Sequence, residues 1–124
     1  MSKISDPAAR VEVIVPVHNQ LHVVRPCLES IARWTDADLD CVTLVADACD
    51  RNTLDFLKDW AVTWQSAQVL ETRRNYGFVR TCNLGLEMSH AACCVLLNSD
   101  TCVTPGWLDK LCTCMESDSE IGSV

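Results

Sequence analysis

The residues of this sequence best suited to chemistry are oxygen-bearing side chains that directly follow apolar runs. There are two such places, the turn Asn98-Ser99-Asp100 after residues 93–97 and Asp47 after residues 41–46. An apolar run that stops at a polar turn is typical of a parallel strand, and open α/β sheets bind ligands outside the carboxyl ends of their strands. A carboxylate there can hold a divalent cation, although Asn, Ser and Asp are also the commonest turn residues.

The elements that must position these side chains alternate between strand and helix. Apolar, β-branched runs predict strands at 11–17, 41–46, 69–72 and 93–97, and helical spacing predicts helices ending near Trp34, over 53–64, over 78–88 and from Pro105 onward. We expect Pro26 near the first turn of the first helix and Pro105 at the first helical position of the last. The alternation predicts an α/β fold with a mostly parallel central sheet flanked by helices, in which the continuously apolar strand 93–97 is central.

Length and composition predict one folded domain over residues 11–124, preceded by a polar tail over residues 1–10. The chain has 124 residues, of which 48% are hydrophobic and 22% charged, enough for a single core without disulfides. No apolar stretch reaches the roughly 20 residues of a membrane span, and no signal peptide is evident. A net charge of −7 with scattered Lys and Arg argues against binding to nucleic acid.

The nine cysteines are interpreted as free thiols in a reducing, cytoplasmic location. Their odd number argues against a complete disulfide framework. Five of them lie on apolar stretches and are predicted to be small core residues: Cys27, Cys41, Cys82, Cys93 and Cys94. The pairs 93–94 and 112–114 have the wrong spacing for a zinc site.

Five segments occur together in an order and spacing that resemble a known family. They are Pro16-Val17-His18-Asn19, Asp47, Asn75-Tyr76-Gly77-Phe78, Asn83-Leu84-Gly85-Leu86 and Asn98-Ser99-Asp100. In this order they resemble the family 2 glycosyltransferases, nucleotide-sugar-dependent enzymes of the GT-A fold, over roughly residues 10–124. The resemblance implies a nucleotide-sugar site made of Pro16, Val17, His18, Asn19, Asp47, Asn75, Gly77, Asn83, Asn98, Ser99 and Asp100.

The resemblance implies that Asp47 contacts the nucleotide base. A carboxylate only accepts hydrogen bonds, so it fits the imide N–H of uracil or thymine, or the N–H groups of guanine. The partner is therefore a nucleoside diphosphate sugar, with uridine or thymidine favoured and guanosine possible. The alternative for Asp47 is an exposed loop acid or helix cap. Ala46 and Cys49 depart from the family pattern on either side of it, which leaves the base open.

The resemblance also implies a divalent metal, manganese or magnesium, at Asp100 and Asn98. Asp100 aligns with the last acid of the family's metal motif, and Asn98 stands where the first acid often does. Hard cations prefer oxygen ligands and keep several waters, so one carboxylate and two diphosphate oxygens make a suitable coordination shell.

The implied reaction is inverting transfer of a sugar to an acceptor hydroxyl on a glycan or a lipid-linked molecule, with action at the membrane face left open. Such transfer needs a base, and no residue here is assigned to that role, so the catalytic residues are unknown. We interpret the chain as the donor-binding part, truncated before the acceptor-binding part. Two alternatives are a noncatalytic nucleotide-binding module and a nucleotidyltransferase, although the latter usually needs a glycine-rich basic loop that is not seen near Pro16.

Overall fold

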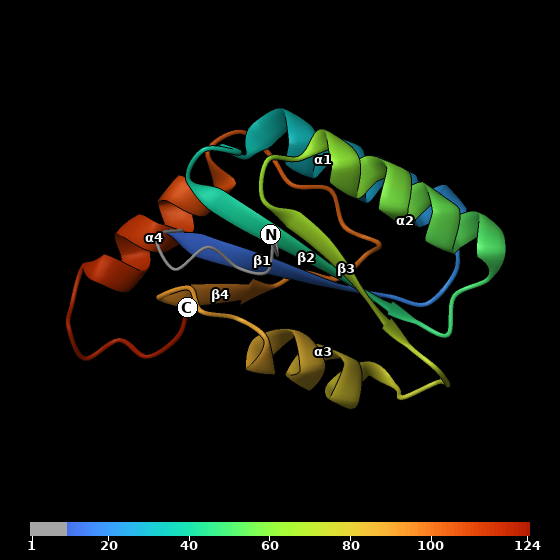
Figure 1. The fold of residues 1–124 in the computed structure, drawn as a ribbon. Coiled ribbons are helices and arrows are strands. Elements are labelled where there is room, and N and C mark those ends of the chain that lie inside the picture. The colour runs from blue at the N-terminus through green and yellow to red at the C-terminus, as the bar shows by residue number, and fades with distance from the viewer. Residues whose placement is uncertain (1–9) are drawn as a thin grey trace.

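A computed structural model describes residues 10–124 as a four-stranded parallel sheet with helices on both faces (Figure 1). The elements are β1 (Val11–Val17), α1 (Leu21–Trp34), β2 (Asp40–Asp47), α2 (Arg51–Thr63), β3 (Ala67–Thr72), α3 (Phe78–Glu87), β4 (Cys93–Leu96) and α4 (Trp107–Glu116). The predicted α/β fold is confirmed. Apart from Arg10, the predicted polar tail lies outside the described residues.

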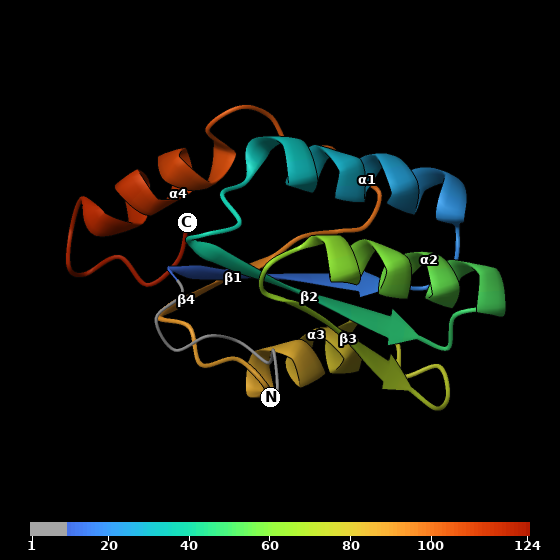
Figure 2. The same cartoon turned by 45° about the horizontal axis from the view of Figure 1, so that its top comes forward.

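The strand order is β3-β2-β1-β4, and every pairing is parallel. Consequently all four strands end at the same edge of the sheet, which is where their arrowheads point in Figure 1. Helices α1 and α2 cover one face and α3 covers the other, as the turned view in Figure 2 shows. This arrangement brings the segments that follow the strands to one rim, as the sequence predicts.

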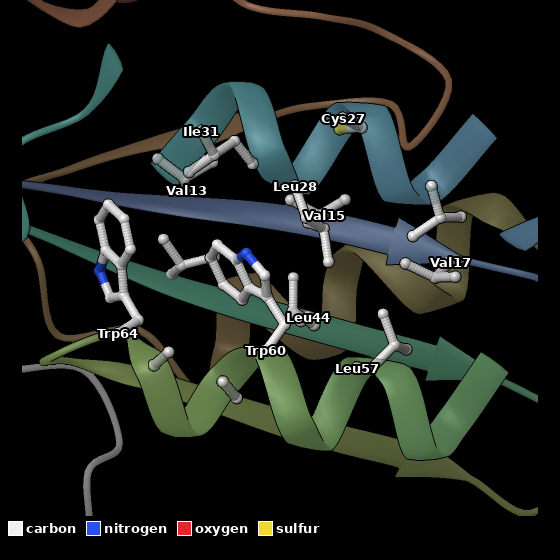
Figure 3. Close-up of a cluster of buried hydrophobic side chains, with 14 of the residues drawn as sticks. Val13, Val15, Val17, Cys27, Leu28, Ile31, Leu44, Leu57, Trp60 and Trp64 are labelled. Carbon is white, nitrogen blue, oxygen red and sulfur yellow. The ribbon is translucent and has the colours of Figure 1, made fainter. Parts of the chain in front are cut away.

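The main core lies between the sheet and the pair α1 and α2 (Figure 3). Every second residue of β1 points into this core, because successive side chains of a strand point to opposite faces. These residues, Val11, Val13, Val15 and Val17, are fully buried. Within this core Trp60 and Trp64 stack with their ring centroids 5.5 Å apart. Burial of this apolar surface stabilises the sheet whose edge carries the site.

The start of α2 is capped by the side chain of Asp50. Asp50 precedes the helix in an extended conformation, and its carboxylate accepts the N–H of Thr53 at 2.8 Å. This hydrogen bond satisfies one of the N–H groups that a helix start leaves without an intrahelical partner. Across the described residues, no helix is long and apolar enough to cross a membrane.

The prediction that strand 93–97 is central is wrong for the described part of the sheet. There β4 pairs with β1 alone and forms an edge of the sheet. Its side chains alternate, with Cys93 and Val95 half-buried and Cys94 and Leu96 exposed, so Cys94 is not the core residue that we predicted. An apolar run has the same appearance in the sequence whether one face or both faces are covered.

Two predicted helix starts are also corrected. Helix α1 already begins at Leu21, so Pro26 lies in its second turn, where the helix continues without that backbone donor. Helix α4 begins at Trp107, after Gly106 in a left-handed conformation with φ 73°, so Pro105 precedes the helix. Glycine adopts this φ at little steric cost, which explains the later start.

Helix α3 packs unusually close to β1 at Gly85. A Cβ atom built on Gly85 would lie 2.5 Å from Cγ2 of Ile14, a side chain that is fully buried in the middle of the sheet. Glycine is a poor helix former, yet here it permits the contact between helix and sheet. The glycine at this position is therefore required by packing, and it sets how closely α3 approaches the sheet.

Candidate functional site

A pocket of about 400 Å³ opens at the rim where the strands end. It is lined by Pro16, Val17, His18, Asn19, Gln20, Val23, Asp47, Asn75, Gly77, Phe78, Thr81, Asn98, Ser99 and Asp100. All of the predicted site residues except Asn83 are among them. Asn83 lies exposed on α3 outside this lining, and its role stays a prediction.

Four lining residues were not predicted to belong to the site: Gln20, Val23, Phe78 and Thr81. Val23 and Thr81 lie in the first turns of α1 and α3, and Phe78 is the first residue of α3, with 58% of its surface exposed. The sequence signal that could have identified Phe78 is an aromatic residue directly after Gly77. Helix starts face the carboxyl ends of preceding strands in such sheets, so their first residues should be considered for the site.

The loops that follow β1 and β2 are joined by three hydrogen bonds. The Nδ1 atom of His18 lies 2.6 Å from the carbonyl oxygen of Asp47, and Asn19 Oδ1 accepts the N–H of Asp50 at 2.7 Å. The thiol of Cys49 donates to the carbonyl of Val17 at 3.3 Å. Since a carbonyl only accepts, Nδ1 of His18 carries a proton in this arrangement. His18 is thus fixed at the rim rather than being an unattached surface residue.

The same two loops contain all the described non-glycine residues with positive φ. These are Asn19, Gln20 and Ala48, with φ values of 56°, 59° and 50°. Asparagine tolerates this region well, but a Cβ atom there approaches a backbone oxygen, which makes alanine unfavourable. The backbone around the pocket is therefore locally strained at Ala48.

Replacing Ala48 with glycine should raise the free energy of unfolding by about 0.5–1 kcal/mol. A left-handed alanine costs about 1–2 kcal/mol, and the greater freedom of glycine in the unfolded chain removes part of that gain. Chemical denaturation measures the change. Ala32→Gly, in the exposed face of α1, is the control, and it should lower stability by about 1 kcal/mol. Equal losses in both variants would contradict the assignment of strain.

Asp47 holds the loop before α3 through its carboxylate. Its Oδ1 accepts the N–H of Tyr76 at 2.7 Å and the hydroxyl of Thr72 at 2.8 Å, and its Oδ2 accepts the N–H of Gly77 at 3.1 Å. Burial acts to raise the pKa of Asp47, but the hydrogen bonds from these groups outweigh burial and lower the pKa below its ordinary value. Asp47 is therefore an ionised acid that both lines the pocket and shapes its wall.

Gly77 is required by the conformation of that wall. It has φ 83°, and its N–H is shared between Asp47 Oδ2 and the side-chain oxygen of Asn75, each at 3.1 Å. Its carbonyl accepts the hydroxyl of Thr81 at 2.6 Å. A Cβ atom at this position would meet no atom within 4 Å, so the requirement for glycine comes from the backbone and not from crowding within the protein.

The segment after β4 is attached to α1. The thiol of Cys27 donates to the carbonyl of Asn98 at 3.7 Å, and the Oγ atom of Ser30 accepts the N–H of Val103 at 3.0 Å. Burial raises the pKa of the Cys27 thiol to about 11, so it remains a protonated donor at neutral pH. These contacts position Asp100, whose own side chain is exposed at the pocket.

Asn98 and Asp100, after β4, could together bind a cation that a ligand also coordinates. Among residues 10–124 no group of three or more His, Cys, Asp or Glu side chains is arranged to hold a metal. The protein thus offers one carboxylate, Asp100, and the amide of Asn98. This small set of oxygens suits Mg²⁺ or Mn²⁺, which are commonly bound by one or two protein groups together with phosphate oxygens and water.

The parallel α/β sheet, with a pocket at its strand ends, has the fold of the GT-A class. The chain belongs to glycosyl transferase family 2, whose profile matches residues 12–124. An uncharacterised glycosyltransferase of Haemophilus influenzae is 23% identical over 111 residues, which cover 90% of this chain and 34% of that protein.

Solved structures share the fold. A mannosyltransferase from Pyrobaculum calidifontis, PcManGT, in complex with GDP-Man and Mn²⁺, has a TM-score of 0.83 at 22% identity, covering 95% of this chain and 36% of its own. Residues 1–349 of S. aureus TarS in complex with UDP-GlcNAc have a TM-score of 0.78 at 19% identity, covering 87% and 31%. The chain thus spans about a third of the length of these relatives.

Proposed function

We propose that this chain is the donor-binding part of a glycosyltransferase that moves a sugar from a nucleoside diphosphate sugar to an acceptor hydroxyl, with inversion and with a divalent metal. The observation that carries the proposal is the single pocket that unites His18, Asp47, Gly77 and Asp100 from four separate segments. Membership of the family supports sugar transfer in general. Neighbours crystallised with UDP-GlcNAc and with GDP-Man and Mn²⁺ support the donor and the metal.

In this proposal the two ends of the pocket bind different parts of the donor. Asp47 and Asn75 would receive the base, because the ionised carboxylate accepts the N–H groups of uracil, thymine or guanine. Although Asp47 Oδ2 already accepts the N–H of Gly77, a carboxylate oxygen has a second acceptor site. The diphosphate would then extend toward Asn98 and Asp100, at the end of β4.

Asp100 and Asn98 would hold the divalent cation, which supplies Lewis-acid stabilisation of the departing nucleoside diphosphate. The protein's contribution is to fix the donor, since the segment after β4 is tied to α1 and the loops after β1 and β2 are tied to one another. The acceptor hydroxyl must lose a proton during transfer, and no residue is assigned as its base. The acceptor, a glycan or a lipid-linked molecule, belongs to the same proposal.

Titration calorimetry with UDP, GDP and ADP, each with and without Mn²⁺, tests the proposal. We expect UDP or GDP to bind at least about 10-fold more tightly than ADP, because one well-placed hydrogen bond to a charged group contributes about 1.5–3 kcal/mol. Manganese should strengthen binding of the preferred nucleotide. Binding of all three with equal affinity, or no binding, would overturn the assignment of the pocket. Release of nucleotide from a bound nucleotide sugar, dependent on an acceptor, separates an enzyme from a binding module.

A further inference from the structure

The hydroxyl of Thr72 lies at the junction of two loops of the pocket, although Thr72 itself does not line it. Thr72 is the last residue of β3 and is only 9% exposed. Its Oγ1 accepts the N–H of Ala48 at 3.2 Å. Its proton has three acceptors within reach, Asp47 Oδ1 at 2.8 Å, the carbonyl of Arg74 at 2.9 Å and the carbonyl of Ala46 at 3.5 Å, of which Asp47 is the nearest. One buried hydroxyl thus connects the loop after β2 with the loop after β3.

We propose that Thr72 is a positioning residue for nucleotide binding, acting through the Asp47 carboxylate. This inference rests on the proposed function. Thr72 holds Asp47 in the orientation in which its two oxygens also receive the N–H groups of Tyr76 and Gly77. The hydroxyl supports the left-handed Ala48 at the same time, so both walls around Asp47 depend on it.

If Thr72 acts through the Asp47 carboxylate, its effect on nucleotide binding should depend on pH. Donors to an ionised carboxylate favour the ionised form, and Thr72 is one of the groups that lower the pKa of Asp47. A protonated Asp47 carries a hydrogen on one oxygen and has lost its negative charge, so it accepts these three donors more weakly. Because the folded-state pKa is lowered, the contribution of these bonds is present above the ordinary aspartate range and is lost as pH falls through the lowered pKa.

Other charged and titratable groups lie on the segments that meet at this rim, and the experiment must keep them constant. They are His18 after β1, Cys49 and Asp50 in the loop after β2, Arg73, Arg74 and Tyr76 before α3, Arg80 on α3, and Asp100 across the pocket. The comparison of Thr72→Val with Thr72→Ser leaves all of them in place. Valine keeps the shape of threonine without the hydroxyl, whereas serine keeps the hydroxyl.

Two measurements on the full chain test the proposal. NMR titration of the Asp47 carboxyl carbon without ligand should give a higher pKa in Thr72→Val than in wild type, with Thr72→Ser close to wild type. Titration of UDP with Mn²⁺ at neutral pH should be about 2- to 10-fold weaker for Thr72→Val, the range expected for one hydrogen bond. The loss of UDP binding on acidification should begin at higher pH in that variant.

The outcomes separate this inference from the proposed function. An unchanged Asp47 pKa in Thr72→Val, or equal behaviour of the valine and serine variants, would overturn the positioning role. If the pKa moves as expected while wild type binds no nucleotide at any pH, the contact between Thr72 and Asp47 is upheld and the proposed function fails. Thermal unfolding of all three proteins identifies a variant that does not fold. If Thr72→Val does not fold, Thr72→Ser is compared with wild type as the pH is lowered, and both should lose UDP binding at the same pH. Loss of UDP binding at a higher pH in Thr72→Ser, which retains the hydroxyl, would overturn the role.

Discussion

Replacing Asp100 with alanine should remove most of the gain in affinity that Mn²⁺ gives to UDP, a loss of at least about 10-fold. Of the described residues that line that end of the pocket, Asp100 is the one with a full negative charge, and Asn98 supplies only a neutral oxygen. Loss even of a group that supports a metal ligand typically costs 10- to 100-fold in metal affinity or activity. Binding of UDP without metal should change much less.

Calorimetric titration of UDP with and without Mn²⁺, on wild type and on Asp100→Ala, measures this effect. Asp59→Ala is the matched control, because Asp59 is also an exposed acid but lies on α2, outside the pocket. It removes the same charge from a protein of net charge −7, so it corrects for long-range electrostatics. Equal dependence on Mn²⁺ in wild type and in Asp100→Ala would refute the metal assignment.

The second large effect is expected at Gly85, where valine should lower the free energy of unfolding by about 3 kcal/mol, the upper part of the range for overpacked sites. Its Cβ would lie 2.5 Å from Cγ2 of Ile14. Ile14 is β-branched and fully buried in β1, so it has little freedom to move away. The small gain in helix propensity over glycine does not offset the clash.

Urea denaturation measures the loss, with Glu87→Val as the control on the exposed side of the same helix. The control should change stability by less than about 1 kcal/mol, since it alters propensity without a buried clash. Because domains of this size are stable by only about 5–15 kcal/mol, the variant at Gly85 should also unfold at a clearly lower temperature. Similar stability of the two variants would show that α3 can move away from the sheet without cost.

The sequence predicted the strands and the rim well because both depend on local patterns. A β-branched run that ends in polar residues marks a parallel strand and its ligand-binding end, as at Asp47 and Asn98. The position of β4 could not be predicted, since its apolar run is compatible with either a central or an edge strand. Pairing partners are set by contacts between distant residues, which periodicity does not report.

The hydrogen bonds within the site also could not be predicted from the sequence. A threonine at the end of a strand, such as Thr72, has no distinguishing sequence pattern. Its role depends on hydrogen bonds with Asp47 and Ala48, which lie more than 20 positions away in the chain. The same holds for the amides of Tyr76 and Gly77, because a backbone donor leaves no trace in the residue type. The sequence indicated which residues meet at the rim, but not which of them hold the others.

The strand order has a consequence for how the pocket is assembled during folding. Strands β1, β2 and β3 pair with neighbours in sequence, whereas β4 pairs with β1 across most of the chain, Val11 opposite Cys93. Closing so long a loop costs entropy before any contact is gained, so such pairings form slowly. The half of the pocket around Asp47 can therefore assemble early, while the half that contains Asp100 is completed only when β4 docks onto β1.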